Sequence, residues 1–546
     1  MRPPLLLPLF GILVPSSALS TAPNVPIKNA NHIFNVIQDS MRQWGSSLHH
    51  NGVSFFLAGV PAGTQFYHGT SKASPVNGTE WLAFEPEHAM VFARPRRGPP
   101  PHLPPDEADT ERQDGGHGEL RKRKDHGTDE KHHGPPGDHP PKAFDENEAG
   151  YLHTYAAAKD LRLLYIDGMS AAKTPKGTLD SQDVVLFNGS FGDPPGRRGR
   201  ESERARLACE MADNEWEGRI DGVLRMEAGF EIILCHFERD LNPVRITQVK
   251  QHPEERRGHQ GNRKHGDRDG PHKEGDGKHH NGYGPKKEDD GKGHGPGGPA
   301  KGPDSSRWMR AITARYNGIG GNRVSLNFNH FVTAFSHNID LFQDNPTLPR
   351  LTSISPEERA VLLAEITDLI MTHQPADTSE DWQAITDMIV TRYSNDLSYL
   401  ASGSIDSSER LQSEIERILS PFIDYDERDD VAEVERCATQ FLPPISSENG
   451  GIAANAVHGV ARKICSSLVE AGKKQDLSSA MQTIQNLVVY LDWATWKECR
   501  GCAANEICVV PIWPMGTVQD YNSPECKDAS NPYDQGGESY WGGMQH

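Results

Sequence analysis

The sequence predicts an α+β domain at the N-terminus, followed by an α-helical bundle and a disulfide-rich C-terminal tail. Short segments rich in Val, Ile, Phe and Leu are concentrated in residues 23–94 and 144–249, and this composition is typical of strands. Between residues 305 and 498, apolar residues recur at helical spacing instead. Four of the eight cysteines lie between residues 499 and 526.

The first residues have the composition of a secretory signal peptide. Arg2 precedes an apolar run from Leu5 to Val14, which is too short to cross a bilayer, and small residues follow it. We therefore expect residues 1–22 to be a signal peptide and the protein to be secreted, with extracellular or cell-wall partners. No later run is long enough to span a membrane. The net charge of −19 argues against a nucleic-acid partner, because phosphates would be repelled.

The α+β domain is predicted from one helix and six strand-like runs. Ile33, Val36, Ile37 and Met41 share a face of a helix over residues 31–45. The strand-like runs that follow are VSFFLAGV, QFYHGT, EWLAF, LRLLYIDG, DVVLF and FEIILCHF. A second helix is predicted over residues 202–220, between the last two runs.

Two low-complexity segments interrupt these blocks. Residues 95–143 and 250–304 consist mainly of Gly, Pro, His and charged residues. Such segments cannot bury enough surface to offset chain entropy, so we expect a disordered insertion and a disordered linker rich in His, Gly and Lys. Their histidines are compatible with weak Zn²⁺ or Cu²⁺ binding, but no fixed ligand spacing is visible, so no metal ligand is assigned.

Helical periodicity and a capping motif predict the helical domain, residues 305–498. In SPEERAVLLAEITDLIMTH, Ser355 is the expected N-cap, Pro356 takes the first helical position and Glu358 completes a capping box. Five further segments up to residue 498 have the same pattern, which predicts a bundle of five or six helices.

The cysteines of a secreted chain are expected to form disulfides. We expect Cys209 to pair with Cys235 and Cys437 with Cys465. The tail, residues 499–546, would pair its cysteines among themselves, and Cys-x2-Cys zinc binding is the alternative for them. These tail cysteines are Cys499, Cys502, Cys508 and Cys526.

Two sequons also agree with secretion. They predict glycosylation at Asn77, in Asn-Gly-Thr, and at Asn188, in Asn-Gly-Ser. A glycan on Asn77 requires residues 71–79 to form an exposed loop.

The stretch GTQFYHGTSKASPVNGTEWLAFEPEHAMVFA, residues 63–93, contains the residues best placed for chemistry. His68 ends a strand-like run. Gly69 and Thr70 after it are expected to let the backbone turn sharply and approach a ligand.

Aromatic residues follow this motif. EWLAF predicts a strand that carries Trp81 and Phe84, and EPEHAMVFA predicts a short helix before Phe92. This order would bring Trp81 or Phe84, together with Phe92, towards one site. Such rings can stack on a flat ligand.

Residues 63–93 resemble the nicotinamide-pocket half of the ADP-ribosyltransferase fold, which poly-ADP-ribose polymerases and diphtheria-type toxins share. The resemblance implies that the α+β domain has this fold and binds NAD as a substrate. It implies that His68 hydrogen-bonds the nicotinamide ribose, while Trp81 or Phe84, with Phe92, encloses the nicotinamide. The family usually has tyrosine where this chain offers Phe92.

A glutamate on a late strand completes the site in that family. Glu231 in GFEIILCHF is the best match, and Glu238 is the second. Cleavage of the N-glycosidic bond of NAD develops oxocarbenium charge, which a carboxylate stabilises. The resemblance therefore implies an ADP-ribosyltransferase or an NAD glycohydrolase, with Glu231 and His68 as catalytic residues.

Other interpretations of the sequence remain open. LYIDGMSAAK, GTLDSQD and IWPMG resemble a family of secreted fungal proteins without assigned activity, which implies no chemistry. The alternative function is a non-catalytic extracellular or cell-wall interaction protein with disordered His-rich spacers. A further carboxylate set, suited to glycoside hydrolysis or cation binding, is Asp167, Asp180 and Asp183.

Overall fold

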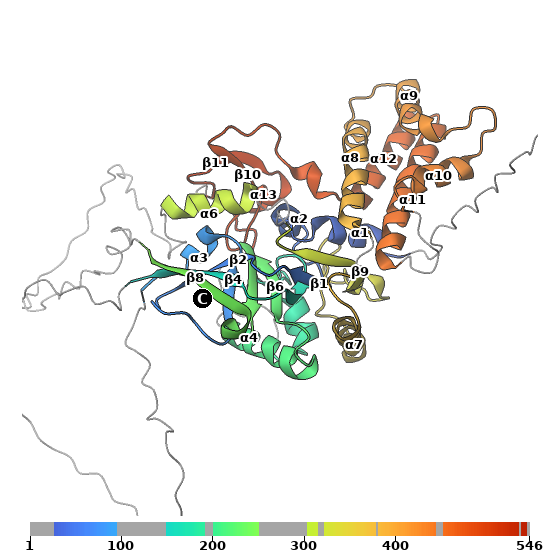
Figure 1. Cartoon of the computed structure of the whole chain (residues 1–546). Coiled ribbons are helices and arrows are strands. Elements are labelled where there is room, and N and C mark those ends of the chain that lie inside the picture. Colours follow the sequence, from blue (N-terminus) through green and yellow to red (C-terminus); the bar gives the residue numbers. More distant parts are fainter. Residues whose placement is uncertain are drawn as a thin grey trace, which may run out of the picture.

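The structure is a computed structural model that describes most of the chain. The described residues are 27–95, 149–191, 200–249, 303–314, 322–377, 380–443, 451–533 and 537–542. The predicted signal peptide and almost all of the two low-complexity segments lie outside these residues. Within them, a curled sheet domain is joined to a helical region with disulfides (Figure 1).

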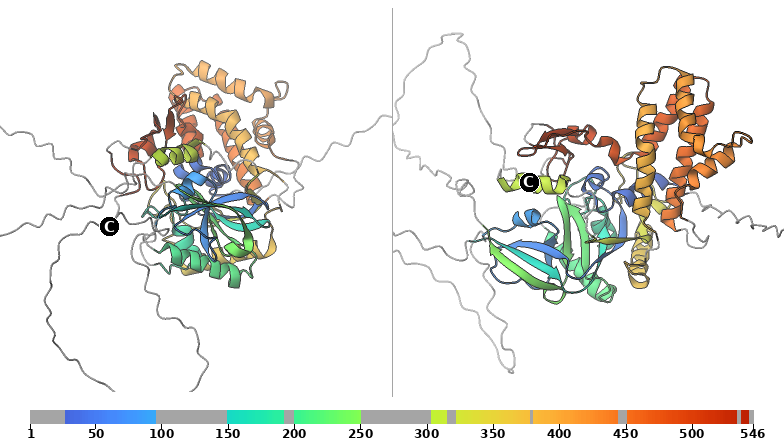
Figure 2. Two further views of the ribbon diagram at one scale, coloured as in Figure 1. Left: turned by 60° about the vertical axis from the view of Figure 1, so that its left-hand side comes forward. Right: turned by 45° about the horizontal axis from the view of Figure 1, so that its top comes forward.

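Nine strands of the described residues form one sheet in the order β8-β4-β2-β3-β7-β6-β5-β1-β9. Figure 2 shows that this sheet is curled. All neighbouring strands run antiparallel except β5 and β6, which are parallel. The strands are β1 (Ser54–Val60), β2 (Gln65–Thr70), β3 (Glu80–Ala83), β4 (Tyr151–Ala157), β5 (Leu161–Ile166), β6 (Gly222–Glu227), β7 (Gly229–Leu234), β8 (Leu241–Gln248) and β9 (Ser325–Thr333).

Five of the six predicted strand-like runs contain a strand of this sheet. The exception is DVVLF, which lies in a π-helical segment, Ser181–Leu186, whose six residues are all buried. The prediction of an all-helical segment from residue 305 was also wrong at β9, which pairs with β1 at the edge of the sheet. The sheet domain therefore contains residues from both before and after the low-complexity segment 250–304.

Short helices accompany the sheet. The helix predicted over residues 31–45 is two helices, because the chain turns at Met41, which has a φ of 58°. The helices of this part are α1 (Ala30–Asp39), α2 (Gln43–Leu48), α3 (Pro86–Met90), α4 (Glu201–Glu210), α5 (Phe237–Asp240) and α6 (Pro303–Ala314). The predicted helix over residues 202–220 corresponds to α4 and the π-helical turn Met211–Glu215.

Five of the described C-terminal helices, α8 to α12, stand beside the sheet domain as a bundle (Figure 1). The predicted capping box of α7 is present, because Ser355 Oγ accepts from the Glu358 N–H and Glu358 accepts from the Ser355 N–H. α7 packs on β9 and β1. The helices are α7 (Pro356–Thr372), α8 (Trp382–Ala401), α9 (Ser408–Leu419), α10 (Asp430–Thr439), α11 (Ile452–Lys473) and α12 (Leu477–Leu491).

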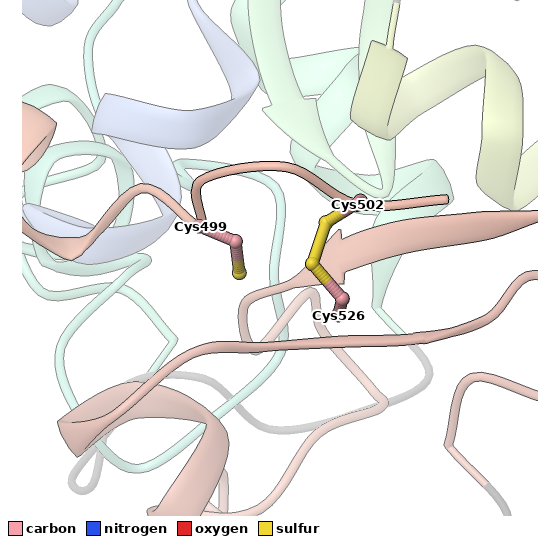
Figure 3. Close-up of side chains that lie close together, drawn as sticks. All are labelled: Cys499, Cys502 and Cys526. Carbon is pink, nitrogen blue, oxygen red and sulfur yellow. A yellow bond between two sulfur atoms is a disulfide. The ribbon is translucent and has the colours of Figure 1, made fainter. Parts of the chain in front are cut away.

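The C-terminal tail is a small disulfide-bonded unit. It contains β10 (Glu506–Val509), α13 (Val518–Asn522) and β11 (Glu525–Asp528), with β10 and β11 antiparallel. All the cysteines lie in described residues and none is free. The pairs are Cys209–Cys235, Cys437–Cys465, Cys499–Cys508 and Cys502–Cys526, which matches the predicted pairing and leaves no thiolate for zinc. Figure 3 shows the bond between Cys502 and Cys526.

Candidate functional site

A cavity of about 340 Å³ lies between β2, β3, α3, β6 and β7. These strands are neighbours in the sheet, since β3 pairs with β2 on one side and with β7 on the other. The lining residues are Tyr67, His68, Gly69, Glu80, Trp81, Leu82, Ala83, His88, Ala89, Phe92, Lys173, Glu201, Arg225, Glu227 and Glu231.

The cavity brings together residues that the sequence analysis singled out. His68 comes from β2, Trp81 from β3 and Glu231 from β7, so three adjacent strands supply them. Phe92 follows α3, and its side chain is 54% exposed. The strand register explains the proximity, because Ala83 of β3 pairs with Glu231 of β7.

Other predicted site residues lie elsewhere. Phe84 is fully buried and packs edge-on against Phe66, with ring centroids 5.1 Å apart, so it belongs to the core. Thr70 does not line the cavity. The second candidate glutamate, Glu238, accepts a hydrogen bond from the Gly78 N–H at 2.7 Å outside the cavity. Of the two aromatic alternatives, the structure therefore brings Trp81 to the site.

Gly69 has a different role from the predicted one. It does not turn the chain, because β2 continues through Thr70 and Gly69 pairs with Leu152 of β4. A Cβ atom at Gly69 would lie 1.9 Å from the carbonyl oxygen of Ala89. The glycine is needed because α3 approaches the strand so closely, and this contact sets one wall of the cavity.

His68 is held as a neutral imidazole. Its Nδ1 lies 2.8 Å from the carbonyl oxygen of Trp81. A carbonyl only accepts, so Nδ1 carries the proton and Nε2 keeps a lone pair. Burial lowers the pKa of His68, although the hydrogen bond to Trp81 opposes the effect. A neutral Nε2 can accept a hydrogen bond from a ligand hydroxyl.

Arg225 of β6 organises the charged part of the cavity. Its side chain is completely buried, and its Nε donates to Glu231 Oε1 at 2.9 Å. Nη1 donates to Gln182 Oε1 at 2.9 Å, and Nη2 pairs with Glu201. Burial raises the pKa of Glu231, although the charge of Arg225 opposes that rise.

Lys173 extends this network. Its ammonium pairs with Glu227 and lies 3.7 Å from Glu201. Burial alone would raise the pKa of Glu201, but the charges of Arg225 and Lys173 outweigh it and lower the pKa to about 2. Arg225 thereby bridges two carboxylates of different character: Glu201, which stays ionised, and Glu231, which holds its proton more readily.

His88 of α3 was missed by the sequence analysis. Its side chain is only 2% exposed, and its Nδ1 has no hydrogen-bond partner among the described residues. Trp308 of α6 stacks on the ring, with centroids 5.9 Å apart. The position of His88 in the expected helix was visible in EPEHAM, but its place in the cavity beside residues of β6 and β7 was not.

The alternative carboxylate set does not form a common site. Asp180 pairs with Arg350, and Asp183 pairs with Arg204. Asp167 is buried separately, where it accepts the Tyr165 hydroxyl at 2.8 Å.

Comparison with known proteins identifies relatives of the sheet domain. The family model described as "YPL277C N-terminal domain" matches residues 23–372, which end at the last residue of α7. Two proteins of Saccharomyces cerevisiae are similar. Uncharacterized protein YOR389W is 34% identical over 229 residues, covering 40% of this chain and 33% of that protein. Uncharacterized protein YPL277C is 35% identical over 230 residues, covering 40% of this chain and 42% of that protein.

The chain thus spans less than half the length of the two yeast proteins it matches. No solved structure matches the chain. Among the described residues, no helix combines the length and apolar character needed to cross a membrane.

Proposed function

The chain belongs to the family of the YPL277C N-terminal domain, and we propose that its sheet domain binds NAD and cleaves the bond between nicotinamide and ribose. The observation that carries this proposal is that Glu231, which is distant in the sequence, lines one cavity with His68, Trp81 and Phe92 of residues 63–93. On this proposal, the domain shares the ADP-ribosyltransferase fold.

The two aromatic side chains supply the nicotinamide subsite. Trp81 lines the cavity from β3, and Phe92 presents a largely exposed ring from the segment after α3. A flat ring bound between them would bury aromatic surface on both faces. The exposed ring of Phe92 gains most, because its apolar surface otherwise faces water.

His68 and Glu231 act on the ribose. The lone pair of His68 Nε2 accepts from a ribose hydroxyl and fixes the sugar. The bond between ribose C1′ and the nicotinamide nitrogen then breaks, and nicotinamide leaves as a neutral molecule with the bonding electrons. The Glu231 carboxylate stabilises the positive charge on the sugar. The oxygen of water or of an acceptor forms the new bond to C1′ and loses a proton.

Nicotinamide release tests the proposal directly. The full-length protein is incubated with NAD, and nicotinamide is quantified by chromatography. Glu231→Gln is expected to lower the release rate by about 10²–10³-fold. Glu238→Gln is the matched control, because that carboxylate lies outside the cavity. The absence of both NAD binding and nicotinamide release in the folded wild-type protein would refute the proposal.

The pH profile adds a second test. Since burial raises the pKa of Glu231, the activity should rise with pH through a value above the ordinary one of this side chain. A profile flat through that range would show that Glu231 does not act as the ionised carboxylate.

A second candidate is non-catalytic ligand binding, which the bond between Arg225 and Glu231 favours. A carboxylate held by a guanidinium is less available to a developing cation. In that case Glu231→Gln would leave NAD affinity unchanged, and neither protein would release nicotinamide.

We also propose that the protein is secreted and glycosylated. The four disulfides of the described residues suit an oxidising compartment. The two predicted acceptors, Asn77 and Asn188, are both exposed. This is tested by expressing the protein in a fungal host and treating the culture medium with a glycosidase. The treatment should change the electrophoretic mobility of the wild type. It should not change that of the Asn77→Gln/Asn188→Gln double variant.

A further inference from the structure

Three potential metal ligands meet at the charged end of the cavity. On β6, Glu227 lies two residues after Arg225, so their side chains share a face, and Arg225 pairs directly with Glu231 of β7. His88 reaches the same place from α3. One ligand atom from each of His88, Glu227 and Glu231 lies within 4.8 Å of the others.

His88 is unusual for a buried polar side chain. Its ring is 2% exposed, yet Nδ1 has no hydrogen-bond partner in the described part of the chain. Buried polar atoms are nearly always partnered, because leaving one unsatisfied costs about 1–3 kcal/mol. An imidazole nitrogen that keeps its lone pair can bind a metal ion, and Nδ1 is free of other partners among the described residues. These properties are those of a ligand without its ion.

The charge of the cavity is consistent with a cation. Among its described lining residues, the carboxylates outnumber the side-chain cations by two. A divalent cation would neutralise the surplus. The carboxylates are Glu80, Glu201, Glu227 and Glu231, and the cations are Lys173 and Arg225.

We propose that His88, Glu227 and Glu231 bind one divalent transition-metal ion at this end of the cavity. One imidazole nitrogen and two carboxylates are a mixed set that suits Zn²⁺ or Mn²⁺ better than Mg²⁺ or Ca²⁺, which favour oxygen ligands alone. Lys173, which now pairs with Glu227, competes with the ion for that carboxylate.

The ion has a consequence that rests on the proposed function. NAD carries a diphosphate, and a cavity with a surplus of carboxylates repels it. A bound divalent ion removes the surplus, so that the ion itself and Lys173 can attract the anion. Metal binding is therefore expected to precede or accompany NAD binding.

Manganese titration of the full-length protein tests the site without any nucleotide. Free Mn²⁺ is followed by electron paramagnetic resonance. Mn²⁺ is the probe because it binds imidazole weakly compared with later metals, so the many histidines of the chain contribute little background. His88→Gln and Glu227→Gln should each weaken binding about tenfold or more, because the first removes the imidazole nitrogen and the second removes a negative charge. His236→Gln is the matched control, since His236 pairs with Asp213 outside the cavity.

A variant that binds Mn²⁺ more tightly than the wild type cannot be explained by damage to the fold. Lys173→Met removes the competing ammonium, so Mn²⁺ binding should tighten about tenfold. Damage to the fold would only weaken binding. Equal Mn²⁺ affinity in the wild type and His88→Gln, or weaker binding in Lys173→Met, would overturn the proposal.

The metal site and the NAD reaction can fail separately. Loss of Mn²⁺ binding in His88→Gln without nicotinamide release from any variant supports the metal site and refutes the NAD reaction. Nicotinamide release that a chelator does not change, combined with equal Mn²⁺ affinity in His88→Gln and the wild type, refutes the metal site alone.

Discussion

Removal of the Arg225 guanidinium is expected to be among the most damaging single changes in the sheet domain. The side chain is completely buried and donates hydrogen bonds to Glu231, Glu201 and Gln182. Arg225→Met keeps an apolar stem of similar length but leaves Glu231 without the cation beside it. Breaking a buried ion pair by removing one partner typically costs about 3–5 kcal/mol, and we expect a loss of that size.

Two further variants test whether charge is the cause. If the unpaired charge of Glu231 causes most of the lost stability, Arg225→Met/Glu231→Gln should be more stable than Arg225→Met alone by about 1–3 kcal/mol. The loss in Arg225→Met should also depend on pH. Without Arg225, the pKa of Glu231 rises further, so the folded state holds a proton that the unfolded chain releases. Stability therefore falls as the pH increases from about 4.5 towards neutrality.

Urea unfolding followed by tryptophan fluorescence at pH 5 and pH 7 measures these effects. Arg206→Met is the control, because Arg206 pairs with Glu210 at the surface and exposed pairs contribute little. The reasoning is refuted if Arg225→Met unfolds at the same urea concentration as Arg206→Met, or if the double variant is no more stable than Arg225→Met.

Three other changes follow from packing, titration and cross-linking. Gly69→Ala should destabilise the protein by about 3 kcal/mol or more, seen as a lower melting temperature, because the new Cβ would lie 1.9 Å from the Ala89 carbonyl oxygen. Burial raises the pKa of Asp167 to about 7, so the folded protein holds a proton that the unfolded chain releases. Stability should therefore fall as the pH rises from about 4 to 7. Urea unfolding of Asp167→Asn should not show that fall. Replacing Cys437 and Cys465 by alanine should lower the free energy of unfolding by about 3–4 kcal/mol, since their disulfide closes a loop with a sequence separation of 28. Unfolding of that variant at the same urea concentration as the wild type would contradict this.

The aromatic and histidine part of the site was predictable because its signal is local. His68, Trp81 and Phe92 lie within one stretch of 31 residues, 63–93, in which strand and helix patterns are short and distinct. To predict Glu231, it was enough to expect that a late strand of the domain lies beside the strands of residues 63–93. The sequence could not choose between Trp81 and Phe84, because the choice depends on which side of β3 faces the core.

The charged part of the site was not predictable. Lys173, Glu201 and Arg225 have no fixed spacing, and they meet only because β6 and β7 pair beside β3 while α4 begins close to them. His88 looked like an ordinary residue of a short amphipathic helix. Its significance comes from the buried Nδ1 atom, which has no hydrogen-bond partner among the described residues, and no sequence pattern encodes this.

The fold was missed where strand patterns are irregular or locally misleading. β9 pairs with β1 through a register shift between Phe56 and Ala58, and such a shift breaks the alternation that marks a strand. DVVLF has the β-branched composition of a strand, but its tertiary context overrides that preference. Its π-helical segment is fully buried, and Asp183 within it is held by Arg204.

The cavity lies within the part of the chain that the family model covers. The family match ends at residue 372, so it includes every residue that lines the cavity and excludes the bundle α8 to α12. A network of buried charges is a poor way to stabilise a domain, since apolar packing of the same volume is often as good or better. Here the network borders an open cavity with exposed aromatic surface, where polar groups can instead contact a ligand. The bundle is also bonded to the sheet domain, because Asn31 and Asn35 of α1 donate to carbonyl groups at the end of α12. Experiments on the cavity therefore require the full chain, and substitutions in the bundle should change stability without changing the identity of the ligand.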